Sequence, residues 1–395
     1  MKEQRKKILF LSGTRADFGK LKPLIQKVKA SPQFEYSIFV TGMHMLSQYG
    51  STWIEIQKAG FDHLYQYINQ DGSVNSQMDL VLANTIQGLG HYIREYPPNM
   101  VVVHGDRVET LAGAIVASLN NILVAHIEGG EVSGTVDESI RHAVTKLSQL
   151  HFVANEEARQ RLIQMGEANE SIFVIGSPDI DVMLSDALPS LHEVKRKYDI
   201  NFSDYAIFLY HPVTTELDKI RKNIATILEA LKASSLNFVT IYPNNDVGTE
   251  VILERFSDIM THPRFRVLPS MRFEYFLTLL KNATVIVGNS SSGMREAPVY
   301  GVPAINIGTR QVNRFQYPTI LNVCEDKDAI LQALSNLPKS VKPSMHFGEG
   351  NSAEGFMKAL CNATLWQTPC QKQFRDLSLE SFPSMPLLSK MRLSG

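Results

Sequence analysis

Two short β-branched runs, each ending in a charged turn that contains glycine, constrain this chain more than any other feature. The runs are Val101-Val-Val-His-Gly-Asp-Arg107 and His126-Ile-Glu-Gly-Gly-Glu-Val-Ser-Gly-Thr-Val-Asp137. In a parallel sheet such turns lie at the carboxyl ends of neighbouring strands, where open α/β folds bind ligands. We therefore expect the carboxylates of Asp106, Glu128 and Asp137 to converge on one crevice. Because crowded like charges are costly to ionise, this grouping favours acid–base chemistry over a purely structural role.

The order of the predicted elements indicates an α/β fold. Short apolar runs alternate with amphipathic helical patterns, which is typical of βαβ units and a parallel sheet. A chain of 395 residues exceeds the size at which one core keeps growing, so we expect two domains. The predicted architecture is two Rossmann-like domains that face each other across a cleft, an analogy that by itself assigns no chemistry.

The expected domains are residues 1–180, with the carboxylates, and residues 181–365, with their own polar strand ends. The segment 366–395 is rich in Ser and Pro and has little periodicity. A frayed terminus and a segment that crosses back to the first domain are both open interpretations of it.

Charge and hydropathy exclude several classes of partner. The formal net charge of −1 gives no electrostatic reason to expect nucleic acid or an anionic membrane. No apolar run approaches the roughly 20 residues that span a bilayer, and the first apolar run is too short for a signal peptide. The three cysteines, Cys324, Cys361 and Cys370, lack metal-type spacing. We therefore expect a cytoplasmic protein.

The first turn, Gly13-Thr-Arg-Ala-Asp-Phe-Gly19-Lys20-Leu21, is predicted to be a strand–loop–helix junction that presents backbone N–H groups to an anion. It matches neither the dinucleotide fingerprint nor the P-loop. Arg15 could donate charge-assisted bonds to a phosphate; pairing with Asp17 or a solvated surface position is the alternative. His44 follows the second strand, on the same expected rim.

The second domain carries a Ser-rich turn, Gly288-Asn-Ser-Ser-Ser-Gly-Met-Arg-Glu296. Its hydroxyl and N–H groups, with Ser290 and Ser291 among them, suit a diphosphate at a helix N-terminus. Glu296 is spaced to accept bonds from ribose hydroxyls, although an ordinary helix N-cap explains the serines equally well. Three further polar residues at strand ends are candidates for the same site: His211, Asn244 and Arg310. For His211, a hydrogen-bonded loop histidine is the alternative.

No metal site or redox cofactor is predicted. His126 and Glu128 are expected to share one face of a strand, but no third His or Cys ligand has suitable spacing. His104 is more consistent with bracing the loop before Asp106 than with binding a metal.

Five blocks together resemble a known family: Val103-His-Gly-Asp-Arg107, His126-Ile-Glu-Gly-Gly-Glu-Val-Ser-Gly-Thr135, Asp137-Glu-Ser-Ile-Arg-His142, His211-Pro-Val-Thr-Thr215 and Gly308-Thr-Arg-Gln311. The chain resembles the hydrolysing UDP-N-acetylglucosamine 2-epimerases of bacterial sialic-acid synthesis. It is also similar to the epimerase domain of the animal bifunctional sialic-acid enzyme. The resemblance extends from Gly13 to about Gly350. Non-hydrolysing 2-epimerases share the fold but not the Glu-Gly-Gly-Glu-Val-Ser-Gly-Thr block.

The resemblance implies a GT-B-like fold, UDP bound mainly by the second domain, and the sugar over the first. The implied nucleotide contacts are Arg15, Arg107, His211, Asn244, Ser290, Ser291, Glu296 and Arg310. The small Gly19 would leave room for phosphate or uracil. Asp106, Glu128 and Asp137 align with the family's catalytic carboxylates.

The implied reaction converts UDP-N-acetylglucosamine and water into UDP and N-acetylmannosamine through 2-acetamidoglucal. We expect Asp106 and Asp137 to handle protons and Glu128 to support the cation or position water, with no cofactor. The same chemistry on UDP-N,N′-diacetylbacillosamine is an alternative. A GT-B glycosyltransferase and a catalytically silent nucleotide-sugar sensor are others. A homodimer is an expectation from the family.

Overall fold

The first domain is built on a seven-stranded parallel sheet. The computed structural model describes residues 5–70, 77–133, 136–244, 246–311, 314–339 and 342–377. The strand order is β3-β2-β1-β4-β5-β6-β7. These strands are β1 (Lys6–Ser12), β2 (Phe34–Val40), β3 (Leu64–Gln66), β4 (Met100–His104), β5 (Leu123–Ile127), β6 (Leu150–Val153) and β7 (Ile172–Val174). The helices are α1 (Arg15–Ala30), α2 (Trp53–Lys58), α3 (Met78–Glu95), α4 (Val108–Leu119), α5 (Val136–Leu147), α6 (Glu156–Gln164) and α7 (Pro178–Met183).

The second domain has a six-stranded parallel sheet in the order β10-β9-β8-β11-β12-β13. Its strands are β8 (Ala206–Leu209), β9 (Phe238–Ile241), β10 (Phe265–Leu268), β11 (Ile286–Gly288), β12 (Ala304–Ile307) and β13 (Ile320–Val323). The helices that follow α7 are α8 (Leu191–Tyr198), α9 (Ile220–Ala233), α10 (Thr249–Met260), α11 (Phe273–Lys281), α12 (Glu296–Val299), α13 (Lys327–Ser335) and α14 (Ser352–Leu360).

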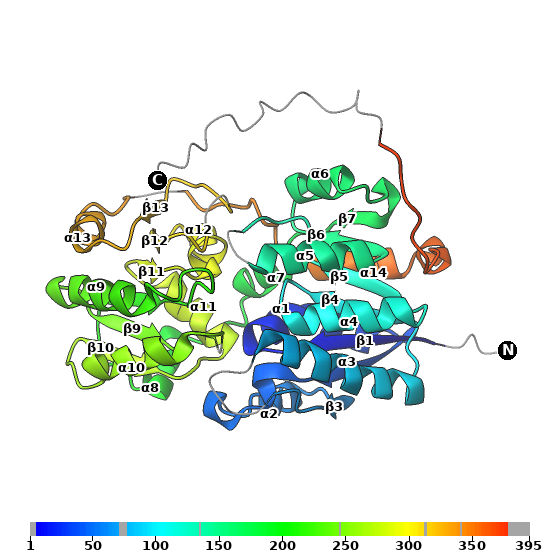
Figure 1. The fold of residues 1–395 in the computed structure, drawn as a ribbon, viewed down its shortest axis with the longest axis horizontal. Coiled ribbons are helices and arrows are strands. Elements are labelled where there is room, and N and C mark those ends of the chain that lie inside the picture. The colour runs from blue at the N-terminus through cyan, green and yellow to red at the C-terminus, as the bar shows by residue number, and fades with distance from the viewer. Residues whose placement is uncertain are drawn as a thin grey trace.

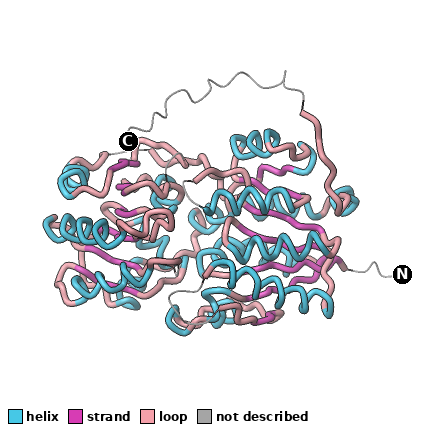
Figure 2. The backbone as a smooth tube through the Cα atoms, viewed as in Figure 1, coloured by secondary structure: helices cyan, strands magenta, loops and turns pink. Residues whose placement is uncertain are grey.

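The two domains lie side by side, and the strands of each sheet run between layers of helices (Figures 1 and 2). Strands β4 and β5 are buried almost throughout, as expected for a sheet covered on both faces. Separate apolar clusters fill the two sides of the first sheet, one around Phe10 and Phe152 and the other around Leu9 and Val101. Successive side chains of one strand therefore anchor different helix layers, which fixes the strand ends where the polar turns begin.

The chain returns to the first domain earlier than the sequence pattern indicated. Helix α14 contacts α1 and β7, and Phe356, Leu360 and Leu365 belong to the core of the first domain. The return thus precedes α14 rather than residue 366, because the apolar face of this short helix packs against the first domain. Further along, Lys372 Nζ donates to the Ser148 carbonyl at 2.8 Å. Residues 378–395 lie outside the described part.

Helix α1 begins at Arg15, early in the turn that was expected to join strand, loop and helix. Thr14 is its N-cap, and the Thr14 hydroxyl accepts a bond from the Asp17 N–H at 3.2 Å, which satisfies one orphan donor. Gly19 therefore lies inside the helix. A Cβ atom there would be 2.5 Å from Cδ1 of Phe273, so the small residue makes room for α11 of the other domain. The expected space for phosphate or uracil is occupied by Phe273.

Within the described ranges, no helix combines the length and apolar character that a membrane crossing requires.

Candidate active site

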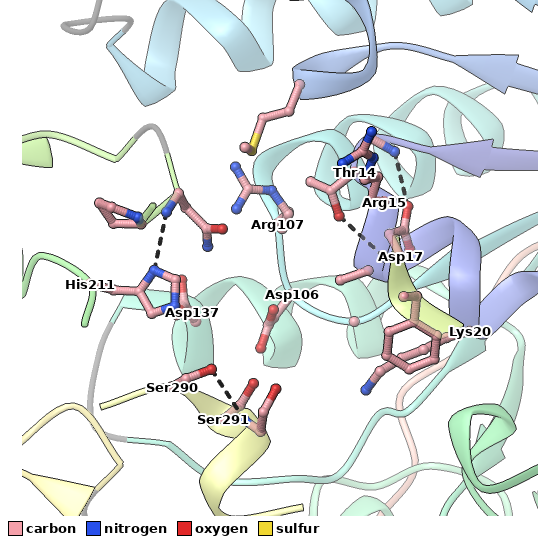
Figure 3. Close-up of a pocket in the computed structure, with 18 of the residues that line it drawn as sticks. Thr14, Arg15, Asp17, Lys20, Asp106, Arg107, Asp137, His211, Ser290 and Ser291 are labelled. Atoms are coloured by element: carbon pink, nitrogen blue, oxygen red, sulfur yellow. Dashed lines mark hydrogen bonds between the residues drawn. The ribbon is translucent and has the colours of Figure 1, made fainter. Parts of the chain in front are cut away.

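A cavity of about 300 Å³ lies between the two domains, at the carboxyl ends of the strands of both sheets. Its volume is at the small end of the range for ligand pockets. Figure 3 shows side chains of both domains pointing into it. With one exception, His44, every site residue predicted from the sequence lines it: Arg15, Asp106, Arg107, Glu128, Asp137, His211, Asn244, Ser290, Ser291, Glu296 and Arg310.

Asp106 follows β4 and forms an ion pair with Arg141 of α5. Arg141 is almost completely buried and also donates to the Glu131 carbonyl at 3.0 Å, so its position is fixed. Burial raises the pKa of Asp106, but the charges of Arg141 and Arg314 outweigh burial and lower it to about 2. Asp106 is therefore ionised at neutral pH.

Glu128 lies directly after β5, in a left-handed backbone conformation with φ of 65°. Its Oε1 is 2.8 Å from Nη2 of Arg295, and its Oε2 is 3.1 Å from Nε2 of His104 and 3.5 Å from Nζ of Lys20. We call Glu128, Lys20, His104 and Arg295 the inner cluster. Burial raises the pKa of Glu128, but Arg295, Lys20 and His104 hold it well below its usual range. The carboxylate is a fixed anion.

The expectation that His126 and Glu128 share a strand face was wrong, because β5 ends at Ile127 and the backbone turns at Glu128. His126 is fully buried, and its Nε2 lies 2.9 Å from the Gly105 carbonyl. Burial lowers the pKa of His126 to about 3, so the neutral ring donates to this carbonyl. His126 therefore braces the turn before Asp106.

Asp137 lies in the first turn of α5, nearer the solvent. Its Oδ2 is 3.4 Å from Nη2 of Arg310, which comes from the other domain; we call these two residues the rim pair. The Asp137 side chain is 30% exposed, against 6% for Glu128, so the two carboxylates differ in hydration. Arg310 also donates to the Asn289 carbonyl at 3.3 Å.

Arg107 faces the rim from the first domain. Its Nε lies 3.4 Å from Oε2 of Glu109, and its Nη2 lies 3.9 Å from Oδ1 of Asp246 across the cleft. Burial opposes the charge of Arg107, but Glu109, Asp246 and Asp137 raise its pKa. Arg107 and Arg310 therefore supply two cations at the same end of the cavity.

The second domain contributes a wall of fixed polar groups. Asn289 accepts a bond from the His211 N–H at 2.7 Å and donates to the His211 carbonyl at 2.8 Å. Nδ1 of His211 accepts from the Asn244 N–H at 3.1 Å. Burial, with Arg310 and Arg107 nearby, keeps the pKa of His211 well below its usual range. The neutral ring thus carries its proton on Nε2 as a donor.

The Ser-rich turn does not lead directly into an α-helix, although this was predicted. The Ser290 hydroxyl accepts from the Ser292 N–H at 3.3 Å, as a cap does, and leads into a short 3-10 helix over Ser291–Gly293. Helix α12 begins only at Glu296 and has four residues. Glu296 is buried on the inner side, with Oε1 3.7 Å from Nζ of Lys20, and burial raises its pKa.

Arg15 and His44 differ from their predicted surroundings. Arg15 reaches across the cleft to the Ser270 hydroxyl at 2.5 Å and pairs with Glu55 at 2.8 Å; neither partner is the Asp17 considered from the sequence. His44 is fully buried and lies 3.0 Å from the Ser12 hydroxyl, and it does not line the cavity. The structure thus does not bring His44 together with the other candidates, because the chain turns it into the core behind the rim.

The sequence analysis did not assign eight of the described charged residues to the site. They line the cavity or pair with its carboxylates: Asp17, Lys20, Glu109, Glu131, Arg141, Asp246, Arg295 and Arg314. His104 belongs with them, because its Nδ1 lies 2.8 Å from Oδ1 of Asp17 while its Nε2 faces Glu128. Burial opposes protonation of His104, but Glu128 and Asp17 raise its pKa to about 9. Among the described residues, no group of three or more His, Cys, Asp or Glu side chains could hold a metal.

Comparison with known proteins identifies the family. The family model described as UDP-N-acetylglucosamine 2-epimerase matches residues 26–361. The chain belongs to this family. It is 48% identical to UDP-N-acetylglucosamine 2-epimerase of Neisseria meningitidis serogroup B, over 95% of this chain and 100% of the relative. It is 36% identical to UDP-N,N′-diacetylbacillosamine 2-epimerase (hydrolyzing) of Legionella pneumophila, over 88% and 94% of the two chains.

The chain is also similar to a protein named for polysialic acid biosynthesis and to a solved structure of the same fold. The chain is 33% identical to polysialic acid biosynthesis protein P7 of Escherichia coli, over 84% of this chain and 85% of the relative. The crystal structure of UDP-GlcNAc 2-epimerase from Neisseria meningitidis bound to UDP-GlcNAc superposes with a TM-score of 0.73 at 20% identity, over 90% of this chain and 99% of that one. The fold is thus the GT-B-like pair of α/β domains that the sequence predicted.

Proposed function

We propose that this epimerase is of the hydrolysing type and converts UDP-N-acetylglucosamine and water into N-acetylmannosamine and UDP, for sialic-acid synthesis. The observation that carries the proposal is the meeting of three carboxylates with different partners in one interdomain cavity. The similarity to a relative named as hydrolysing and to one named for polysialic acid supports it.

The reaction inverts carbon 2, so a proton must leave one face and another must arrive on the opposite face. That proton is weakly acidic, and departure of UDP from carbon 1 assists its removal through an oxocarbenium-like transition state. Elimination gives 2-acetamidoglucal, and water then adds at carbon 1 while carbon 2 is protonated. Such a sequence needs a base, an acid and an anion near the cation.

The three carboxylates suit these tasks differently. Asp106 is held ionised by Arg141, so it is in the unprotonated form that the base of the reaction requires. Glu128 is a buried anion with cations on both oxygens, which supports a role beneath the developing cation rather than in proton transfer. Asp137 is the more hydrated carboxylate and is left as the second proton-handling group.

The leaving diphosphate needs compensation of its charge, which preorganised donors supply best in a site shielded from water. Arg107 and Arg310 line the cavity together with Ser290, Ser291 and His211, and both act on the His211 ring by their charge. This arrangement supports UDP binding along the second domain. No step of the proposed reaction requires a redox cofactor.

Hydrolysis of UDP-N,N′-diacetylbacillosamine is the second candidate, favoured by the 36% identity with the Legionella enzyme. Incubation with each UDP-sugar in parallel, followed by NMR of nucleotide and sugar, tests both proposals. We expect UDP-N-acetylglucosamine to give free UDP and free N-acetylmannosamine at the higher rate. A product that is still a UDP-sugar would contradict the hydrolysing type, and a higher rate on the diacetyl sugar would reassign the substrate.

A further inference from the structure

The two carboxylates that flank the reacting carbon in the proposed function are held by arginines in different ways. Asp106 is paired with Arg141, whose side chain is 1% exposed and which also donates to the Glu131 carbonyl. Asp137 faces Arg310 across the cleft, and Arg310 belongs to the domain expected to bind UDP. Both arginines line the cavity, but Arg141 is held by Asp106 and the Glu131 carbonyl at 1% exposure, whereas Arg310 is 12% exposed.

We propose that the Asp137–Arg310 pair is a charge switch that UDP operates: binding of the diphosphate draws Arg310 away and protonates Asp137, which then becomes the acid of the reaction. The inference rests on the proposed function and settles which carboxylate is base and which is acid. Arg310 acts through Asp137 and is in this respect a positioning residue.

Electrostatics gives the direction of the switch. A cation at 3.4 Å favours the ionised form of a carboxylate, and a nearby anion favours the protonated form. Three arginines act on Asp137 from the elements around it: Arg310 after β12, Arg107 before α4, and Arg141 one turn along α5. All three line the cavity, and Arg310 and Arg107 are the two for which contact with the diphosphate is proposed. Binding of UDP thus reduces their effect on Asp137 and adds negative charge beside it.

The exposure of Asp137 permits the exchange. Its side chain is 30% exposed, so a proton can enter from solvent before the cleft is filled. Glu128 cannot serve in this way, because the inner cluster places cations at both of its oxygens.

The proton balance of the cycle is complete. Asp137 takes a proton from solvent when the UDP-sugar binds. Asp106 removes the proton from carbon 2 while the bond between carbon 1 and oxygen breaks, and UDP leaves with the electron pair. As UDP departs, Arg310 returns to Asp137 and favours its ionised form, so the proton passes from Asp137 to the other face of carbon 2. Water adds its hydroxyl to carbon 1, and the protons left on Asp106 and from water go to solvent.

The test is proton uptake linked to UDP binding. Calorimetry in two buffers of different ionisation enthalpy, at about pH 7.5, measures it directly, because the phosphates of UDP are then largely ionised. We expect the wild-type protein to take up more than about 0.3 and up to one proton per UDP, and its UDP affinity to fall correspondingly as pH rises. Absence of uptake in the wild type would overturn the proposal without any variant.

Two matched variants locate the proton. Asp137→Asn should abolish the uptake, whereas Asp106→Asn should retain it, since Arg141 keeps Asp106 ionised with and without UDP. Asp258→Asn removes an exposed carboxylate 3.3 Å from Arg255 and serves as the control that should match the wild type. Uptake that persists in Asp137→Asn, or that disappears in Asp106→Asn, would contradict the assignment.

Failure of this inference and failure of the proposed function are distinguishable. If the wild type releases free N-acetylmannosamine but binds UDP without proton uptake, only the charge switch is wrong. If uptake occurs but the product is a UDP-sugar, the hydrolysing type is wrong and the charge switch stands.

Discussion

The inner cluster and the rim pair place the same chemical group, a carboxylate beside arginine, in two contrasting settings. Glu128 in the inner cluster is 6% exposed and has cations at both oxygens. Asp137 in the rim pair is 30% exposed and faces Arg310 of the other domain at 3.4 Å. The buried cations at both oxygens fix the charge of Glu128, whereas Asp137 keeps access to solvent and to a ligand. The comparison teaches that the burial of the neighbouring cations, more than whether the acid is Glu or Asp, decides whether a carboxylate stays ionised or can exchange a proton.

The largest difference between the two regions is expected in stability. Arg295→Met leaves Glu128 and Glu131 buried without a shared cation, which should lower the free energy of unfolding by about 3–5 kcal/mol. Arg310→Met at the more hydrated rim should lower it by about 1 kcal/mol or less. Urea denaturation of both variants measures this difference. Equal losses of unfolding free energy would show that the inner cluster contributes no more to stability than the rim pair.

A second contrast concerns catalysis. Asp106→Asn keeps the size of the side chain but removes the base, so turnover should fall by about 10²-fold or more. UDP affinity should stay near the wild-type value, because the nucleotide is proposed to lie mainly on the second domain. Steady-state kinetics with calorimetry of UDP binding checks both. A variant that retains more than about a tenth of the activity would remove Asp106 from the chemistry.

The inner cluster should also respond to pH through His104. Its pKa is raised from 6.5 to about 9, so protonation stabilises the fold fully below about pH 6.5, and this contribution is lost as pH rises through about 9. The stability gap between wild type and His104→Gln should thus shrink by up to about 3 kcal/mol over that window. Denaturation at several pH values tests this, with exposed His63→Gln as control. A gap independent of pH would contradict a charged His104.

The last contrast concerns UDP binding, where each effect is that of a single phosphate contact. Arg310→Ala and Arg15→Ala should each weaken UDP binding by about 1.5–3 kcal/mol if the bonds are charge-assisted. Arg15 is the sharper case, because it is engaged by Ser270 and Glu55 in this structure and must exchange those partners. Unchanged UDP affinity in both variants by calorimetry would refute the proposed phosphate site.

The sequence predicted which strand ends form the site, but not which charged side chains form ion pairs there. Asp106 and Glu128 follow strands whose apolar runs are unmistakable, so their convergence follows from the parallel sheet. Arg295 and Glu131 meet across 164 positions of the chain, and no local pattern reports such a pair. His44 shows the converse limit: a residue can follow a strand and still turn into the core.

The central claim is that carbon 2 loses its proton and receives another from the opposite face, with release of UDP. Incubation of the wild-type protein with UDP-N-acetylglucosamine in deuterated water, followed by proton NMR, tests it most directly. The account predicts free UDP and free N-acetylmannosamine that carries deuterium at carbon 2. Free N-acetylglucosamine that retains its proton at carbon 2 would contradict the account and leave simple hydrolysis of the sugar nucleotide in its place.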